Sequence, residues 1–177
     1  ESFGYMVGDA VRDKDAVAAC ALMAEMTAWA KDNGMSIFEL IQEVYLQFGY
    51  GKEKGISVVR KGKSGAEEIQ QMMKDFRANP PKEIAGSKVA LIKDYQTLVA
   101  RNVVTGEESK LAFPTTSNVL QYFTEDGTKV SVRPSGTEPK IKFYIEVRGK
   151  MTSRADFARC ESEATAKVDA VRASLGV

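Results

Sequence analysis

One stretch of strict alternation constrains the fold of this chain more than any other feature. Every second residue from 141 to 147 is apolar: Ile141, Phe143, Ile145 and Val147. The residues that alternate with them are polar: Lys142, Tyr144, Glu146 and Arg148. Successive side chains of a β-strand point to opposite faces of a sheet. The pattern therefore predicts a strand with one face in a core and one toward water, as antiparallel sheets allow.

Other strands are predicted upstream of this one. The dipeptide Asp126-Gly127 separates two strand-like runs, residues 119–124 and 128–133, and is typical of the turn of a β-hairpin. Residues 56–61 and 89–95 are rich in branched apolar side chains and are also predicted to be strands. Short turns between successive strands indicate an antiparallel sheet.

Four helices are predicted from capping residues and apolar periodicity. Their approximate ranges are 15–33, 36–48, 64–78 and 152–175. Ser36 with Glu39, and Ser64 with Glu67, have the spacing of a capping box. From residue 53 onward the order is strand, helix, several strands and helix. This order predicts an α+β fold, with an antiparallel sheet and helices packed on one of its faces.

The first 50 residues contain two predicted helices and no predicted strand. The first helix is apolar on nearly all sides, so we expect it to be buried, with Trp29 in the core. The segment from Gly49 to Gly55 holds three glycines and three charges, which favours a linker or a domain boundary. The predicted domains are therefore residues 1–52, the end of one domain, and 53–177, a second domain.

Composition excludes several classes of function. The chain has 25 Lys and Arg against 24 Asp and Glu, and this balance argues against a binder of nucleic acid or of a membrane surface. It has no His, which excludes a Ser-His-Asp triad, a Cys-His dyad and a His-ligated zinc. Cys20 and Cys160 are far apart in the sequence, which favours a reducing, cytoplasmic setting over a disulfide framework. The apolar runs are all shorter than the roughly 20 residues of a membrane span.

The segment from Arg133 to Lys140 gathers the groups that bind an oxyanion. It lies between two predicted strands and contains a guanidinium, the hydroxyls of Ser135 and Thr137, and backbone N–H groups around Gly136. A phosphate is bound by such a set of planar bidentate donors, hydroxyls and a concave nest of N–H groups. Glycine also permits backbone conformations that are closed to other residues. The alternative is an ordinary rigid turn whose polar side chains face water.

Two motifs resemble those of a known family. The run R-P-S-G-T-E-P-K-I-K-F-Y resembles the phosphate-binding loop in the C-terminal domain of the α-D-phosphohexomutases, the phosphoglucomutase/phosphomannomutase family. The opening E-S-F-G, followed by residues 12–15 (R-D-K-D), resembles the sugar-recognition loop in the third domain of that family. The resemblance covers essentially the whole chain and is strongest to bacterial phosphoglucomutases of the larger type. It implies a C-terminal sheet similar to that of the TATA-binding protein, preceded by the helical tail of an α/β domain.

The resemblance also implies roles for individual residues. It identifies Arg133, Ser135, Gly136 and Thr137 as ligands of the substrate phosphate that is not transferred. Ser2 matches the serine that contacts sugar hydroxyls, and Lys14 matches a lysine that points into the cleft and binds substrate. The implied reaction interconverts hexose 1-phosphate and hexose 6-phosphate, with glucose as the first choice and mannose as the second, through a bisphosphorylated sugar.

The implied cofactors are Mg²⁺ and glucose 1,6-bisphosphate. The family's phosphoserine lies in a first domain and its Asp-rich D-x-D-x-D metal loop in a second, and neither motif occurs in these 177 residues. We therefore expect no catalytic residue and no metal ligand here, no turnover by this chain alone, and the N-terminal domains of the same polypeptide as partners. The alternative is a non-catalytic α+β module that binds a protein or nucleic acid.

Overall fold

The computed structural model describes residues 6–9, 11–60 and 62–177. The chain divides into two compact units. The first contains the residues up to Tyr50 together with Lys150–Phe157, and the second contains Gly51–Gly149 and Ala158–Val177. Each unit is described by itself below.

The first unit contains helix α1 (Ala16–Asp32), helix α2 (Ile37–Phe48) and the short 3₁₀ helix η1 (Arg154–Asp156). The Asp15 carboxylate caps α1, because it accepts hydrogen bonds from the backbone N–H groups of Val17 (3.1 Å) and Ala18 (2.9 Å). After α1 the chain turns at Gly34, whose φ of +69° favours glycine. The predicted ranges of both long helices are confirmed.

The prediction that α1 is buried is wrong for the described structure. Ala30 is its one buried residue, and the Trp29 side chain is 53% exposed. Helix α2 has no buried residue, although Phe38 and three other apolar side chains recur along it at helical spacing. Phe38 is 76% exposed. The described residues therefore leave apolar surface of both helices uncovered.

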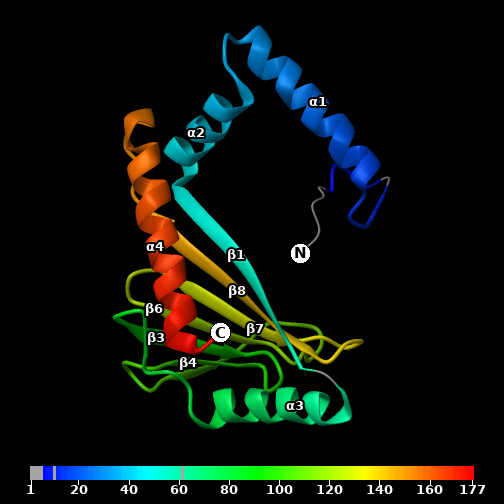
Figure 1. Ribbon diagram of the computed structural model, residues 1–177, viewed down its shortest axis with the longest axis vertical. Coiled ribbons are helices and arrows are strands. Elements are labelled where there is room, and N and C mark those ends of the chain that lie inside the picture. Colours follow the sequence, from blue (N-terminus) through cyan, green and yellow to red (C-terminus); the bar gives the residue numbers. More distant parts are fainter. Residues whose placement is uncertain (1–5, 10, 61) are drawn as a thin grey trace. The chain divides into compact units, whose positions relative to one another are not determined.

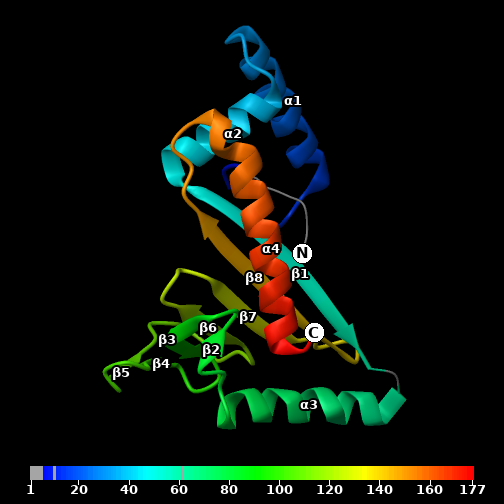
Figure 2. The same cartoon turned by 60° about the vertical axis from the view of Figure 1, so that its left-hand side comes forward.

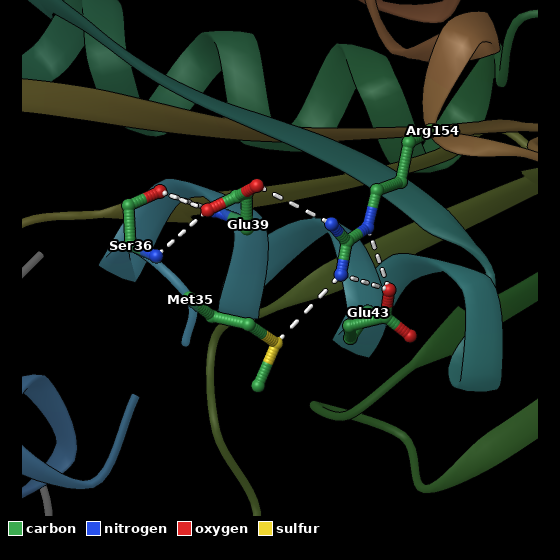
Figure 3. Close-up of polar contacts among 5 residues, drawn as sticks. All are labelled: Met35, Ser36, Glu39, Glu43 and Arg154. Carbon is green, nitrogen blue, oxygen red and sulfur yellow. Dashed lines mark hydrogen bonds and ion pairs between the residues drawn. The ribbon is translucent and has the colours of Figure 1, made fainter. Parts of the chain in front are cut away.

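An ion-pair network fastens residues 150–157 to α2 (Figure 3). The Arg154 guanidinium donates from Nε to Glu43 Oε1 at 2.7 Å, and its Nη1 lies 3.4 Å from Glu39 Oε1. The second oxygen of Glu39 accepts from the Ser36 backbone N–H at 2.7 Å, which completes the predicted capping box. Chiefly this backbone hydrogen bond lowers the pKa of Glu39. A single carboxylate therefore both caps α2 and binds Arg154.

The second unit is built on one eight-stranded sheet (Figure 1). Its strands are β1 (Tyr50–Val59), β2 (Glu83–Ile84), β3 (Ser87–Asp94), β4 (Val99–Asn102), β5 (Glu108–Lys110), β6 (Leu120–Thr124), β7 (Lys129–Pro134) and β8 (Lys140–Gly149). Their order is β1-β8-β7-β6-β3-β4-β5, with β2 paired to β3. The pairs from β8 through β5 are antiparallel, as predicted.

Two helices cover one face of this sheet: α3 (Gly62–Ala78) and α4 (Phe157–Leu175) (Figure 2). The alternating apolar side chains of β8 are buried, whereas Lys142, Tyr144 and Glu146 between them are less buried. The Phe76 ring on α3 contacts the rings of Phe143 and Tyr122, with centroids 5.9 and 6.4 Å apart. The predicted α+β fold, an antiparallel sheet with helices on one face, is thus confirmed. The likeness to the TATA-binding protein stays a prediction.

Three details differ from the sequence prediction. The segment Gly49–Gly55 is not a linker, because β1 begins at Tyr50 and lies beside β8 in the sheet. The division between the two compact units nevertheless falls inside this segment, after Tyr50. Helix α3 begins at Gly62, so Ser64 is inside the helix and not its cap. Strands β2, β4 and β5 were not predicted, since all three are short and β5 is exposed along its whole length.

The Tyr122 hydroxyl completes the C-terminal end of α3. The Phe76 carbonyl would accept its helical hydrogen bond from the N–H of residue 80, but that residue is Pro80 and has none. Tyr122, fully buried in the sheet, donates its hydroxyl to this carbonyl at 3.0 Å. Burial raises the pKa of Tyr122 well above its ordinary value, so the hydroxyl remains a donor.

We predict that Tyr122→Phe lowers the free energy of unfolding by about 1–2 kcal/mol, because it leaves the partly buried Phe76 carbonyl without a donor. Urea denaturation of both proteins measures the difference. Tyr95→Phe is the matched control, since the Tyr95 hydroxyl bonds to Gln121 at 3.0 Å in a less buried place. We expect a smaller loss for the control, and equal losses would contradict this role for Tyr122.

The turn between β6 and β7 is tied to α4 through Asp126. Its carboxylate accepts hydrogen bonds from Lys167 Nζ (2.7 Å), the Thr124 hydroxyl (2.5 Å) and the Thr128 N–H (3.1 Å). Burial alone would raise the pKa of Asp126, but these donors outweigh burial and hold the pKa well below its usual range. Lys167 also donates to the Ala85 carbonyl at 2.9 Å, so α4 fastens two hairpin turns at once.

The lowered pKa of Asp126 predicts a pH dependence of stability. A carboxyl with a lowered folded-state pKa stabilises the fold above its unfolded-state pKa, about 3.9, and loses this contribution as the pH falls further. The difference in unfolding free energy between the parent and Asp126→Asn should be largest at neutral pH and shrink below about pH 4. Asp169→Asn, which changes an exposed carboxylate of α4, should show no such convergence in urea titrations.

Candidate functional site

The loop between β7 and β8, Ser135–Pro139, is the candidate site. A hydrogen bond from the Ser135 N–H to the Lys140 carbonyl (2.8 Å) closes its base. A second bond, from the Lys140 N–H to the Glu138 carbonyl (2.7 Å), tightens its end. On either side of the loop, Pro134 and Ile141 are paired and buried in the sheet. Both ends of the loop are therefore fixed by strands whose side chains are packed in the core.

Several hydrogen-bond donors of this loop are unused. In the described part of the chain, the backbone N–H groups of Gly136 and Glu138 donate to no other residue. The Ser135 hydroxyl oxygen accepts a long bond of 3.4 Å from the Thr137 N–H. Both hydroxyl hydrogens remain available. The loop therefore presents two N–H groups and two hydroxyls to a ligand.

Arg133 stands at the base of the same loop. Its side chain is exposed and, among residues 6–9, 11–60 and 62–177, has no hydrogen-bond or ion-pair partner. The register of the sheet pairs Arg133 with Lys142. These two side chains therefore lie on the sheet face opposite to that of Val132 and Phe143, which the helices cover.

A pocket of about 370 Å³ lies between the loop and α3. The loop residues Ser135–Pro139 form one wall, and the other consists of Gly62, Ala66, Ile69 and Gln70. Arg133 does not line this pocket. The structure therefore brings Ser135, Gly136 and Thr137 together on the pocket, and it places Arg133 on the other side of the loop. The α3 wall escaped the sequence prediction, because it comes from residues about seventy positions away.

The backbone of Gly136 does not require glycine. Its φ lies outside the left-handed region, and a Cβ at this position would meet no atom within 4 Å. The expectation that Gly136 permits a special backbone conformation is therefore wrong. Its exposed N–H, with no side chain beside it, is the feature that a ligand could use.

The charges near the loop are partly neutralised within it. Lys140 forms an ion pair with Glu138, so its ammonium offsets a carboxylate that would otherwise repel an anion. Lys142 is half-buried and has its own interaction partner. The guanidinium of Arg133 is consequently the charge in this region that is most available to an anionic ligand.

The sequence predicted two further site residues in the first unit. Ser2 lies outside the described residues. Lys14 precedes α1, is exposed, and forms an ion pair with Asp13 at 3.0 Å. The hydrogen bond from the Lys14 side chain is the main cause of the lowered pKa of Asp13. Lys14 thus belongs to the first unit, and the phosphate-binding candidates belong to the second.

The described residues hold neither a candidate metal site nor a membrane-spanning helix. Among residues 6–9, 11–60 and 62–177, no three His, Cys, Asp or Glu side chains are grouped so as to hold a metal ion. The helices of this part of the chain also lack the length and hydropathy needed to cross a membrane.

Comparison with known proteins identifies the family. Residues 53–164 match the sequence profile of the phosphoglucomutase/phosphomannomutase C-terminal domain. Phosphoglucomutase from Staphylococcus haemolyticus (strain JCSC1435) is 35% identical over 147 residues, which are 83% of this chain and 26% of the relative. Phosphoglucomutase from Staphylococcus aureus (strain MRSA252) is 34% identical over 148 residues, or 84% of this chain and 26% of the relative. The chain belongs to the phosphoglucomutase/phosphomannomutase family, as the two motifs indicated.

The relatives are much longer than this chain, which spans about a quarter of their length. A solved structure of parafusin, a phosphoglucomutase from Paramecium in its open form, is 17% identical. The two structures superpose with a TM-score of 0.43, and the matched region covers 92% of this chain and 28% of the parafusin chain.

Proposed function

We propose that this chain supplies the substrate-phosphate-binding part of a phosphohexomutase that interconverts hexose 1-phosphate and hexose 6-phosphate. Glucose phosphates are the proposed substrates, and mannose phosphates are the second choice. The β7–β8 loop would hold the phosphate group that is not being transferred. Arg133, Ser135, Gly136 and Thr137 are the proposed ligands.

The observation that carries this proposal is the set of unused donors on the loop. Two N–H groups and two hydroxyls belong to one hairpin loop, and the Arg133 guanidinium, which has no partner among the described residues, stands at the base of that loop. A phosphate dianion accepts several hydrogen bonds at once, and charge-assisted bonds are worth about 1.5–3 kcal/mol each. The guanidinium of Arg133 can bind two phosphate oxygens in parallel.

The proposed reaction explains why a loop of this kind is suitable. The sugar carries a phosphate at either end in turn, so one site must accept both orientations. Backbone N–H groups and a guanidinium recognise the dianion and make no demand on the sugar ring. Binding energy from this remote phosphate orients the substrate and helps to lower the barrier at the reacting end.

Other parts of the full-length enzyme complete the proposed site. Ser2 would contact sugar hydroxyls, and Lys14 would bind substrate from the first unit. The N-terminal domains of the same polypeptide are the proposed partners of α1 and α2. The exposed apolar side chains of these helices, including Trp29 and Phe38, and the greater length of the relatives support this assignment.

The chemistry itself is assigned to residues outside this chain. We propose that the phosphoserine and Mg²⁺ are held by the N-terminal domains, since the described residues contain no cluster that fits a metal ion. Mg²⁺ supplies charge neutralisation during phosphoryl transfer. Glucose 1,6-bisphosphate would serve the full-length enzyme as its activator. The chain alone would bind the phosphosugar without turning it over, and a cytoplasmic location is part of the same proposal.

The competing function is a non-catalytic α+β module that binds a protein or a nucleic acid. The near-equal numbers of acidic and basic residues disfavour nucleic acid. Titration with DNA and with glucose 6-phosphate separates the two functions. Binding of DNA that weakens steeply with salt would favour the module, whereas saturable binding of glucose 6-phosphate favours the mutase.

We predict that Arg133→Ala in the full-length enzyme lowers kcat/KM by about 10- to 100-fold or more, because each 1.4 kcal/mol of lost binding is a factor of ten. Arg133→Lys should restore only part of this loss, since an ammonium keeps the charge but not the bidentate geometry. Thermal unfolding should change little, because the side chain is exposed and unpaired among the described residues.

Arg101→Ala is the matched control. Arg101 is another exposed arginine of the sheet, on β4, without a partner in the part of the chain that the structure describes. Its replacement should leave kcat/KM unchanged. An unchanged kcat/KM for Arg133→Ala, or a lowered melting temperature with normal kinetics, would end the phosphate-binding role of Arg133.

A further inference from the structure

We propose that Gly65, at the start of α3, positions the phosphate-binding loop by way of the Arg60 backbone. This inference rests on the proposed function, because it names a residue that acts on the same site without touching the ligand. It concerns a close approach between α3 and the chain that leaves β1. Gly65 is therefore a positioning residue.

Gly65 permits a contact that no other residue would allow. A Cβ at this position would lie 2.6 Å from the Arg60 carbonyl carbon and 2.7 Å from both the Cβ and the carbonyl oxygen of Arg60. Contacts under 3.0 Å do not occur for real Cβ atoms, and here two of the three atoms belong to the backbone and cannot swing aside. Gly65 is buried, and its φ is not in the left-handed region. Its requirement for glycine is one of space.

Arg60 transmits this contact to the loop. It directly follows β1, and its N–H donates to the Pro139 carbonyl at 2.9 Å. Pro139 is the last residue of the loop before β8. The Arg60 side chain is also held to α3, because its Nε lies 3.3 Å from Glu68 Oε2. Helix α3 thus fixes Arg60, and Arg60 fixes one end of the loop.

Adding a methyl group at residue 65 would separate Arg60 from α3. The movement would lengthen or break the hydrogen bond from the Arg60 N–H to Pro139, and the loop would lose an anchor on its β8 side. Ligands held by several converging donors are sensitive to displacements of about 1 Å. We therefore expect the donors of Gly136 and Glu138 to lose their alignment, although neither residue contacts Gly65.

The test compares the parent chain with Gly65→Ala, using two measurements. The first is hydrogen exchange at the Arg60 amide, which reports the bond to Pro139 whether or not a ligand binds. The second is the Kd of glucose 6-phosphate from titration calorimetry. Gly65→Ala should accelerate hydrogen exchange at the Arg60 amide and raise the Kd of glucose 6-phosphate by about 10-fold or more. The buried amides of β6 and β7 should keep their protection from exchange.

Gly55→Ala is the matched control. Gly55 lies on β1, and a Cβ there would meet nothing within 4 Å. This variant should keep both the parent exchange rate at Arg60 and the parent Kd. If Gly65→Ala fails to fold, Glu68→Gln is the second variant, because it removes the ion pair between Arg60 and α3. It should accelerate hydrogen exchange at the Arg60 amide and raise the Kd of glucose 6-phosphate by about 2-fold, as expected for an exposed ion pair.

The outcomes separate this inference from the proposed function. Unchanged exchange at Arg60 in Gly65→Ala would overturn the inference. Faster exchange at Arg60 with an unchanged Kd would also overturn it, and the proposed function would stand if Arg133→Ala still weakens binding. If the parent chain exchanges as expected but does not bind glucose 6-phosphate, the proposed function fails, and the role of Gly65 in phosphate binding fails with it.

Discussion

The register between β7 and β8 is the constraint on which the rest of the second unit depends. Val132 lies opposite Phe143, and Pro134 lies opposite Ile141, all four on the face that the helices cover. A slip of β8 by one residue would turn Ile141 and Phe143 toward water, so burial fixes the pairing. The same register sets where the hairpin closes, at the bond from Ser135 to Lys140. Packing of the core therefore decides which backbone groups the loop exposes.

Much of this fold could be predicted from the sequence, because local patterns encode it. The alternation in β8 and the Asp126-Gly127 turn each depend on neighbours in the chain. The role of Gly49–Gly55 could not be predicted, since its place beside β8 is a pairing between segments about ninety residues apart. The prediction that Trp29 is buried failed for a different reason. An apolar helix indicates that some segment covers it, but the sequence does not say which segment that is.

The sequence predicted one part of the candidate site, and the structure was needed for the rest. The types of residue in the loop, a guanidinium, hydroxyls and N–H groups, could be predicted because they are consecutive in the sequence. Strand alternation places Arg133 on the opposite sheet face from Val132, and this could be predicted. Which of the two faces the helices cover, and therefore that Arg133 lies away from the pocket, could be learned only from the structure. The contact of Gly65 with Arg60 had no sequence signal beyond an extra glycine in a helix.

Phosphate binding by the β7–β8 loop is tested most directly by an NMR titration of backbone amides. The Gly136 and Glu138 amides, which have no partner among the described residues, should shift in a saturable manner with glucose 6-phosphate and with glucose 1-phosphate. Glucose without a phosphate should leave them unchanged, because the donors recognise the dianion. Saturable shifts confined to residues outside the loop, or equal shifts with glucose, would contradict the assignment of this loop as the phosphate site.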